Sequence, residues 1–353
     1  MGRNWLTEEQ VEQAVYGGAI LGGGGGGWIG QGLENGKKAL TKGRVELVTI
    51  DELKGSDKAV CVSLVGAPAA KEQYVSDAQF YDTIELMQSN YPESIQAIIT
   101  NENGAATTVN GWLQAALTGL PILDAPCNGR AHPTGSMGAL NLSEKPEYIS
   151  YQTAAGGKWE RAVRAFMSGE LQTIGDAVRT MSVAAGGMVA VARNPVSIEY
   201  LYKNAAVGGI SQAIELGKIY LSETIGLNKI EAVTTSLQGR IVKVGTVNAF
   251  QLNTAGGFDV GVLKVDDCEL TFWNEFMTIE EKGERKGTFP DLIMTFDVET
   301  GAPVVSAEIR TGQKLAVICV PKSELLLSST MANPQLLRTI EPVIQKKDCL
   351  RRV

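Results

Sequence analysis

The spacing of apolar residues changes several times along the first half of the chain. Apolar residues recur at helical spacing over 11–19, and Thr7 with Gln10 has the spacing of a capping box, so a helix is predicted to run into the glycines that begin at Gly22. Helical spacing also predicts helices over 77–90 and 109–117. Runs of β-branched and apolar residues predict buried strands over 45–50, 59–65, 95–100 and 121–123. Alternating strands and helices predict an α/β domain with a mainly parallel sheet.

The pattern becomes β-like after about residue 227. Before that point, helical spacing continues over 159–175, 177–184 and 211–221. After it, short β-like runs cover 239–247, 258–265, 268–276, 292–296 and 314–320, and spacing over 333–346 predicts a last helix. We therefore expect an α/β domain over 1–227, a β-rich domain (a small barrel or sandwich) over 228–325, and a C-terminal helix over 326–353 that could pack back on the first domain.

Charge and composition exclude several classes of protein. The 353 residues carry a net charge of −7 with no basic run longer than a pair, so we expect no nucleic-acid partner. The chain has neither an 18-residue apolar segment nor a signal-peptide pattern at its start, which predicts a cytoplasmic protein without a membrane partner. The five cysteines are scattered without a CxxC pair and are expected to be reduced. Homo-oligomerisation is expected from base rates alone.

The glycine run over 22–27 is the first candidate for a functional loop. It satisfies the dinucleotide motif GxGxxG only because every position is glycine, and a helix rather than a strand is predicted before it, so no nucleotide cofactor is expected. One interpretation is a loop that lets two backbones approach closely. The other is a set of N–H groups that face an anionic or carbonyl-bearing ligand and are supplied by Gly23, Gly24, Gly25 and Gly26.

Polar residues follow two of the predicted strands directly. Asn101, Glu102 and Asn103 come after the strand that ends at residue 100, where ligands bind in open α/β sheets, although a hydrogen-bonded turn would use the same residues. The segment 124–133 contains the densest set of reactive side chains, namely Asp124, Cys127, Asn128, Arg130 and His132, which is the only histidine.

This second segment is compatible with two kinds of site. Cys127 and His132 could form a nucleophilic pair, or Asp124, Cys127 and His132 could bind a divalent metal such as zinc. The structural alternatives are a buried thiol at Cys127, an ion pair at Arg130 and a surface imidazole at His132. In the β-rich half, Asn274 and Glu275 end an apolar run, with a structural role or a contact across the domain cleft as the alternatives.

Six motifs occur in the same order as in a known family. They are ILGGGGGG (20–27), NENGA (101–105), LPILDAPCNGRAHP (120–133), FWNEF (272–276), FPDLIMTFDVETGAP (289–303) and IRTGQKLAVICVP (309–321). Over nearly its whole length the chain resembles the S-methyl-thiohydantoin desulfurase-like family. The resemblance implies an α/β domain followed by a β domain, and a link to hydantoinase or oxoprolinase systems, one of which could supply a partner protein. It also implies hydrolysis of an S-methylated thiohydantoin to the hydantoin, with release of a thiol.

The resemblance covers some candidate residues and not others. Glu102 matches the acidic residue of the family's Glu-x-Gly-Gly loop, and Asn274 with Glu275 matches its Asn-Glu motif. Asp124 and Arg130 match the family's Asp-Ala-Asp-Gly-x-Gly-Arg-Ala-Phe-Pro-Glu stretch, as do three neighbours, Gly129, Ala131 and Pro133. Four positions depart from that stretch: Pro126 replaces an aspartate, Cys127 a glycine, His132 the aromatic residue and Thr134 a glutamate.

Two functions from different classes remain open at this point. The first is a hydrolase of a small hydantoin-like or thiohydantoin-like ring, with Glu102 or Asp124 as base, Cys127 as nucleophile beside His132, and Arg130 as an electrostatic clamp. Substrate contacts would come from the glycine amides, Asn101, Asn103, Asn128, Asn274 and Glu275. The second is a non-catalytic ligand-binding subunit of a hydantoinase-type system, which the missing carboxylates favour.

Overall fold

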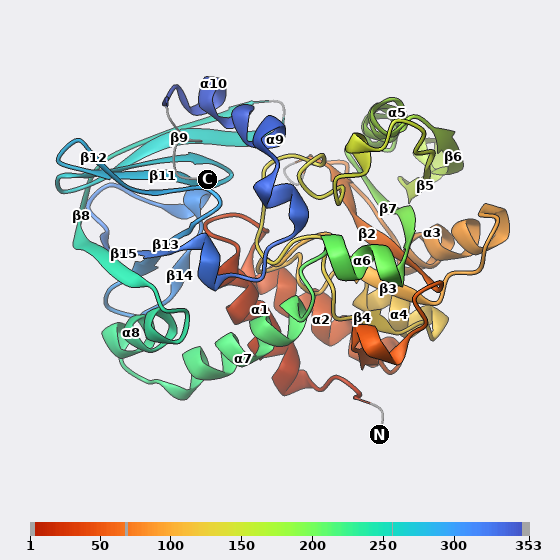
Figure 1. Ribbon diagram of the computed structural model, residues 1–353, viewed down its shortest axis with the longest axis horizontal. Coiled ribbons are helices and arrows are strands. Elements are labelled where there is room, and N and C mark those ends of the chain that lie inside the picture. The colour runs from red at the N-terminus through yellow and green to blue at the C-terminus, as the bar shows by residue number, and fades with distance from the viewer. Residues whose placement is uncertain (1–3, 68–69, 256, 348–353) are drawn as a thin grey trace.

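Two sheets organise the molecule. The computed structural model describes residues 4–67, 70–255 and 257–347. Within these residues a seven-stranded sheet forms from the first part of the chain and an eight-stranded sheet from the last part (Figure 1). The helices α1 (Glu8–Leu21) and α7 (Gly209–Ser222) pack on each other between the two sheets. An α/β domain followed by a β-rich domain is confirmed.

The first sheet is mixed, with parallel strands on the side that carries the candidate residues. Its order is β1 (Leu47–Val48), β4 (Ile122–Leu123), β3 (Ala97–Thr100), β2 (Lys58–Gly66), β7 (Met188–Ser197), β5 (Ser150–Gly156) and β6 (Val163–Gly169). The first four strands pair in parallel, and the remaining pairings are antiparallel. The carboxyl ends of β3 and β4 therefore lie at one edge of the sheet.

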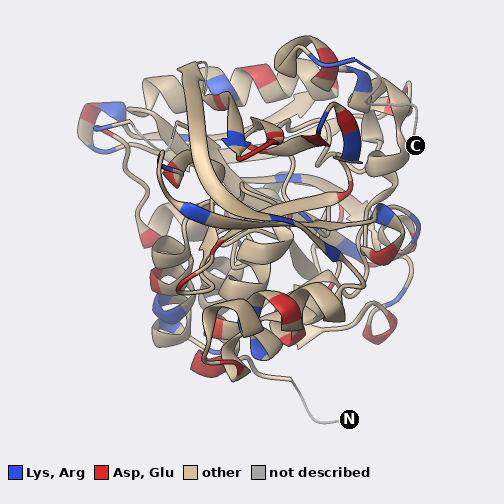
Figure 2. Ribbon diagram, turned by 90° about the vertical axis from the view of Figure 1, so that its left-hand side faces the viewer, with Lys and Arg blue, Asp and Glu red and all other residues tan. Residues whose placement is uncertain are grey.

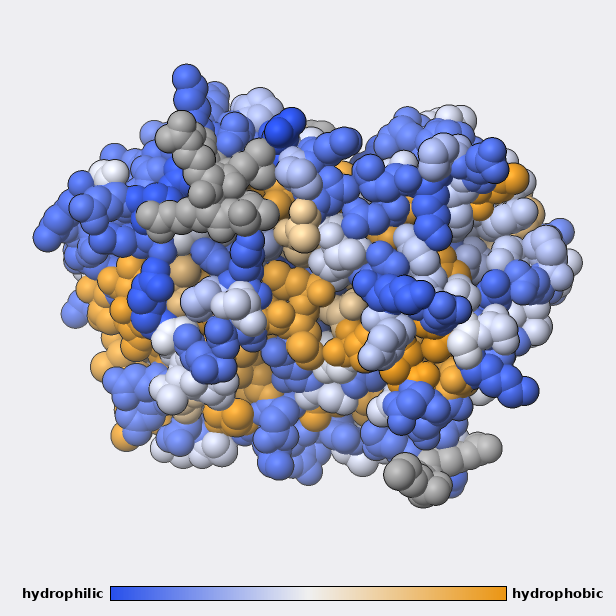
Figure 3. All heavy atoms as spheres, in the orientation of Figure 1, coloured by the Kyte–Doolittle hydropathy of each residue, from blue (hydrophilic) through white to orange (hydrophobic). Residues whose placement is uncertain are grey.

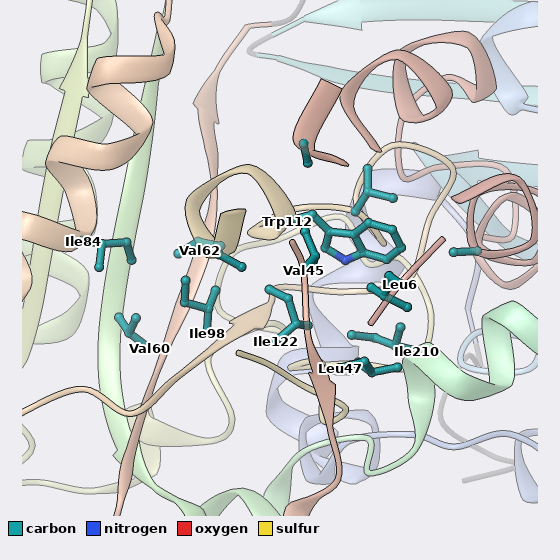
Figure 4. Packing of buried hydrophobic residues seen from close by; sticks show 14 of the residues in the cluster. Leu6, Val45, Leu47, Val60, Val62, Ile84, Ile98, Trp112, Ile122 and Ile210 are labelled. Carbon is teal, nitrogen blue, oxygen red and sulfur yellow. The ribbon is translucent and has the colours of Figure 1, made fainter. Parts of the chain in front are cut away.

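Helices and a long irregular segment cover the two faces of this sheet. On one face α2 (Ile29–Lys42), α3 (Asp77–Asn90) and α4 (Trp112–Thr118) bury an apolar core around Trp112, with side chains of β2, β3 and β4 beneath them (Figure 4). On the other face α6 (Ile198–Asn204) and the segment 124–148 pack over Cys61, Ile99 and Leu123. The candidate residues lie on this second face.

Several predicted elements differ from the structure. The predicted helix over 159–175 is wrong, because β6 occupies Val163–Gly169 as the edge strand and α5 (Leu171–Ala184) begins only after Gly169. The strand predicted over 45–50 shortens to β1 because the chain turns into a 3-10 helix at Ile50–Glu52. The strands β5 and β7 were not predicted at all. By contrast, α3 covers the predicted range, with the Ser76 and Gln79 capping box at its start.

The second sheet is antiparallel and curls around its own core. Its order is β12 (Glu284–Thr288), β11 (Glu275–Glu281), β10 (Cys268–Trp273), β9 (Phe258–Val265), β8 (Arg240–Ala255), β15 (Lys314–Val320), β13 (Leu292–Asp297) and β14 (Pro303–Val304). Inward side chains of β9 to β11, such as Phe272 and Ile279, pack against those of β13 and β15, such as Ile293 and Val317. The outer face of β13 and β15 packs on α1, α7 and α8 (Gly226–Ser236).

Helix α1 connects the two cores. Its first half buries Val11 and Val15 in the core of the first sheet, and its end buries Ile20 and Leu21 against β13 and β15. It crosses α7 closely, because a Cβ at Gly17 would lie 1.8 Å from the carbonyl oxygen of Ala213. The glycine loop that follows α1 is thereby placed where the two sheets meet.

The C-terminal segment touches both domains. The single helix predicted over 333–346 is broken at Thr339 into α9 (Pro334–Arg338) and α10 (Ile340–Ile344). Side chains of Thr330 and Asn333 bind the first domain, at the Met137 carbonyl and at Asn141, whereas α10 packs on β9 and β10.

Charged and hydrophilic residues lie on the surface, whereas the described cysteines are buried. Basic and acidic residues are interspersed over the β-rich side (Figure 2), and hydrophilic residues cover most of the face shown in Figure 3. Within the described ranges, no helix combines the length and apolarity needed to cross a bilayer. The four cysteines that are described are buried and free, and Cys349 lies outside the described residues.

Candidate functional site

Two loops at the carboxyl ends of β3 and β4 form the centre of the site. The loop after β3 carries Glu102, and the loop after β4 carries His132. Backbone hydrogen bonds join the loops, from the Cys127 N–H to the Thr100 carbonyl and from the Asn103 N–H to the Asn128 carbonyl. The two predicted polar clusters are therefore one structural unit.

Glu102 and His132 are in direct contact in a buried setting. The Nε2 atom of His132 lies 3.3 Å from Oε2 of Glu102, and the same oxygen accepts the backbone N–H of His132 at 3.2 Å. Glu102 is 7% exposed and His132 is 9% exposed. Burial raises the pKa of Glu102 to about 8 and lowers the pKa of His132 to about 4. At pH 7 the pair is thus a neutral carboxylic acid beside a neutral imidazole.

The segment that follows His132 covers the imidazole at Gly138. A Cβ at Gly138 would lie 2.6 Å from both Cε1 and Nε2 of His132, so the segment that follows His132 folds back over the ring. The Thr330 hydroxyl holds this segment by donating to the Met137 carbonyl at 2.6 Å. The covering segment is therefore tied down by the C-terminal part of the chain.

Arg193 is a member of this cluster that sequence reasoning missed. It lies on β7 directly opposite Cys61 on β2 and Gln152 on β5, on the sheet face that carries the site. Its charge acts on Glu102 and His132, lowering the pKa of each. The signal was present, because Arg193 is a charged residue that directly follows the apolar run 188–192.

Cys127 does not pair with His132. Among the described residues no hydrogen bond links these two side chains, and Cys127 packs instead beside Cys61 in the core under α6. The hydrogen bond with Cys61, followed by burial, raises the pKa of Cys127 well above its usual range. The hydrogen bond with Cys127, helped by the charge of Arg193, lowers the pKa of Cys61, although burial opposes this shift. Cys127 therefore remains a protonated thiol at neutral pH.

Asp124 has a structural task. Its carboxylate accepts the backbone N–H groups of Ile210 at 2.7 Å and of Ser211 at 3.2 Å, at the start of α7. Burial raises its pKa although these donors oppose the shift. The described ranges hold no group of three or more His, Cys, Asp and Glu side chains that could bind a metal ion, so Asp124, Cys127 and His132 do not form such a site.

The candidate amides mainly hold the loops together. Asn103 donates to the Gly209 carbonyl at 2.7 Å, and Asn101 accepts from the side chain of Asn110 at 2.9 Å. Asn128 accepts the N–H of Ser328, but its Nδ2 atom has no partner among the described residues. Asn274, in a left-handed turn with a φ of 57°, accepts the backbone N–H of Asp259.

Arg130 and Glu275 connect the site to the second sheet. Arg130 is fully buried, stacks 4.5 Å from the ring centroid of Phe289 and donates from Nη1 to the carbonyl oxygens of Pro290 and Asp291. Burial lowers the pKa of Arg130 to about 10, still well above neutral pH. Burial and the nearby Glu102 raise the pKa of Glu275 well above its usual range, and Arg130 opposes this shift.

The glycine loop is the junction between these groups. A Cβ at Gly25 would lie 1.9 Å from Oε1 of Glu275, and one at Gly23 would lie 2.5 Å from Nη2 of Arg130. The Gly24 carbonyl accepts the N–H of Ser306 in the second domain, and the Gly26 carbonyl accepts the N–H of Ala106 in the first. Close backbone approach, one of the two interpretations of the loop, is therefore what the structure shows.

Polar atoms without partners gather at the site. Eleven buried side-chain polar atoms lack a hydrogen-bond partner within the described ranges, and six of them belong to Asn128, Arg130, His132 and Glu275. Buried polar groups normally have partners, so such a concentration marks a place for water or a ligand. The unpaired set contains donors on Asn128 and Arg130 and an acceptor on Glu275, which suits a small polar molecule.

Both halves of the chain match models of one family. Residues 9–158 match the S-Me-THD-like N-terminal domain, and residues 170–333 match the S-Me-THD-like C-terminal domain. The chain belongs to the S-Me-THD-like family. Glu102 and His132 fall in the N-terminal domain of S-Me-THD-like proteins, and Arg193 and Glu275 fall in their C-terminal domain.

A solved structure shares the S-Me-THD-like fold of this chain. The crystal structure of a protein from Chromobacterium violaceum matches with a TM-score of 0.71 over 96% of each chain, at 20% sequence identity. At this identity the match shows a common fold. A search of the curated proteins found no match. The family name points to a function that involves thiohydantoins.

Proposed function

We propose that this protein hydrolyses the C–S bond of a small S-methylated thiohydantoin-like ring and releases a thiol. The observation that carries the proposal is the buried contact between Glu102 and His132, in a chain of the S-Me-THD-like family. A neutral acid and a neutral base side by side are suited to moving protons to and from an uncharged ring.

In the first step, water adds to the ring carbon that bears sulfur. An imidazole nitrogen of His132 takes a proton from the water, and the water oxygen forms a bond to the substrate carbon that bears sulfur. Glu102 gives its proton to the substrate nitrogen next to this carbon, and that nitrogen receives the electron pair of the C=N bond. The result is a tetrahedral intermediate, a protonated imidazole and a carboxylate, whose opposite charges stabilise each other across the 3.3 Å contact.

In the second step, the intermediate collapses. The C–S bond breaks, the sulfur leaves with its electron pair and takes the proton from His132, and the hydroxyl proton returns to Glu102 as the carbonyl forms. The products are a hydantoin and a thiol, and both side chains regain their starting state. A hydantoin is in turn a substrate for ring-opening hydrolases, which is the class of partner that the family resemblance implies.

Arg130, Asn128 and Glu275 position the ring in this proposal. Arg130 and Asn128 offer buried N–H donors that have no partner among the described residues and that suit a ring carbonyl oxygen. Glu275 offers an acceptor for a ring N–H. Asp124 and Cys127 take no part in this proposal, because the first caps α7 and the second is a thiol buried in the core with Cys61.

The test is a turnover assay with matched variants. S-methyl-thiohydantoins and hydantoins are incubated with the protein, thiol release is followed by mass spectrometry, and Glu102→Gln and His132→Gln are compared with the exposed control Glu215→Gln. We expect thiol release by the wild type and the control, and a loss of about 100-fold or more in the two site variants. Tight binding of a ring without any turnover would overturn the proposal and favour the accessory ligand-binding subunit.

A further inference from the structure

We propose that Arg193 binds a carboxylate carried by the substrate, on the side chain at ring carbon 5, so that the preferred rings derive from acidic amino acids. This inference rests on the proposed function and specifies its substrate class. It depends on where the strands place Arg193. It also depends, among the described residues, on the lack of a carboxylate paired with Arg193 and on a buried acceptor beside it that has no hydrogen-bond partner.

A β-bulge directs Arg193 toward the site. The register between β2 and β7 pairs Ala59 with Val196 and Cys61 with Arg193, so Asn194 and Pro195 together oppose the single residue Val60. Bulges of this kind re-aim side chains next to functional sites. The bulge is held firmly, because Asn194 adopts a φ of 54° and its side chain accepts from the hydroxyl of Ser150 at 2.7 Å.

Among the described residues, Arg193 has the thiol of Cys61 beside it but no carboxylate partner. No described carboxylate lies within ion-pair distance of its guanidinium, in contrast to Arg161, Arg164 and Arg285, which all form such pairs. Glu102, on which the charge of Arg193 acts, is mainly protonated at neutral pH. No ionised carboxylate among the described residues therefore pairs with Arg193, and an anionic ligand would supply this ion pair.

Gln152 supplies the second observation. It lies opposite Arg193 on β5, is 3% exposed, and donates from Nε2 to the hydroxyl of Ser150 at 3.0 Å. Its Oε1 atom has no partner within the described ranges, even though the guanidinium is on the adjacent strand. A buried acceptor left open beside a partly exposed cation fits a ligand with both an N–H donor and an anionic group. A C5 carboxylate on a hydantoin-type ring has this combination, and a guanidinium fork matches a carboxylate in two hydrogen bonds.

The experiment compares two substrates that differ in one charge. The S-methyl-thiohydantoin with a carboxymethyl group at carbon 5 is measured against its carbamoylmethyl isostere, with wild type, Arg193→Met, Arg193→Lys and the exposed control Arg179→Met. We expect the wild type and the control to favour the carboxylate in kcat/KM by about 10- to 100-fold. Arg193→Met should lose this ratio, and Arg193→Lys should keep part of it. If Arg193 had only a structural role, Arg193→Met would lower kcat/KM for both substrates together and leave their ratio unchanged.

The outcomes separate this inference from the proposed function. Equal kcat/KM for the two substrates in the wild type, or an unchanged ratio in Arg193→Met, overturns the inference and leaves thiol release standing. If neither ring is turned over, the proposed function fails, and calorimetric affinities for the same two rings decide the role of Arg193. Tighter binding of the carboxylate that disappears in Arg193→Met supports it, and equal or absent binding overturns it.

Discussion

His132 Nε2 lies 3.3 Å from Glu102 Oε2, although the two residues are 30 positions apart in the chain. Two strand ends create this contact, since β3 leads into Glu102 and β4 leads into the segment that contains His132. Burial keeps both groups uncharged, with the pKa of Glu102 near 8 and that of His132 near 4. The proposed chemistry and the first prediction both follow from this pair.

The stability of the fold should depend on the protonation of Glu102. Its pKa rises from an ordinary 4.5 to about 8 on folding, so the folded state holds the proton more tightly than the unfolded state. The contribution of this group to the free energy of unfolding is therefore greatest below pH 4.5 and is lost as the pH rises through 8. Each unit of pKa difference corresponds to about 1.4 kcal/mol. In urea unfolding, the free energy of unfolding should therefore fall more between pH 5.5 and pH 8.5 in the wild type than in Glu102→Gln. Equal losses in both proteins would contradict the burial of an ionisable group at this position.

Asp124 should matter for stability and not for the chemical step. Removing the carboxylate in Asp124→Ala leaves the N–H groups of Ile210 and Ser211 without their acceptor, at a cost of about 1–2 kcal/mol. Asp124→Asn keeps a capping oxygen and should unfold close to the wild type. Both variants should retain kcat within about threefold. A loss of 100-fold in Asp124→Asn would show instead that Asp124 acts as the base.

Gly138 should be sensitive to a single added methyl group. In Gly138→Ala the new Cβ would lie 2.6 Å from the imidazole of His132, so the ring or the covering segment must shift. Turnover should fall by about 10-fold or more, because small displacements of a reacting group are costly. Gly135→Ala is the matched control, since a Cβ there meets nothing within 4 Å. Similar activity in the two variants would mean that the segment does not fix the position of His132.

Cys127 should be dispensable for turnover. The hydrogen bond with Cys61 and burial hold the thiol in its protonated form, and no hydrogen bond among the described residues links it to the imidazole. We expect Cys127→Ala to keep thiol release within a few-fold of the wild type and to lose roughly 1 kcal/mol of stability through the small cavity. Iodoacetamide should label Cys127 only after unfolding. Rapid labelling of the native protein together with loss of turnover would restore Cys127 as nucleophile.

Local sequence signals predicted those parts of the fold that local interactions decide. Helical spacing predicted α3 to the residue, and the apolar run 258–265 predicted β9 in the same way. The edge strand β6 was mistaken for a helix, because Phe166 and Met167 sit on a half-exposed strand whose apolar spacing also fits a helix. Strand order and register depend on contacts distant in sequence, which no local pattern records.

The same limit applies to the site. Glu102 and His132 were found because each follows a predicted strand in a cluster of polar residues. Arg193, Cys61 and Gln152 were missed, since only the register of β2, β7 and β5 brings them together. Asp124 was a candidate base by its residue type, and its contacts with α7 are those of a helix cap.

The central claim is that a protonated Glu102 delivers a proton beside a neutral His132. The pH dependence of kcat/KM for thiol release tests this claim most directly. With an S-methyl-thiohydantoin substrate, kcat/KM of the wild type should be constant around pH 7 and fall above about pH 8 as Glu102 ionises. Glu102→Gln should be about 100-fold slower or more and should lack this alkaline decline. A wild-type profile that rises through pH 8, or a variant that keeps both the rate and the decline, would contradict the account.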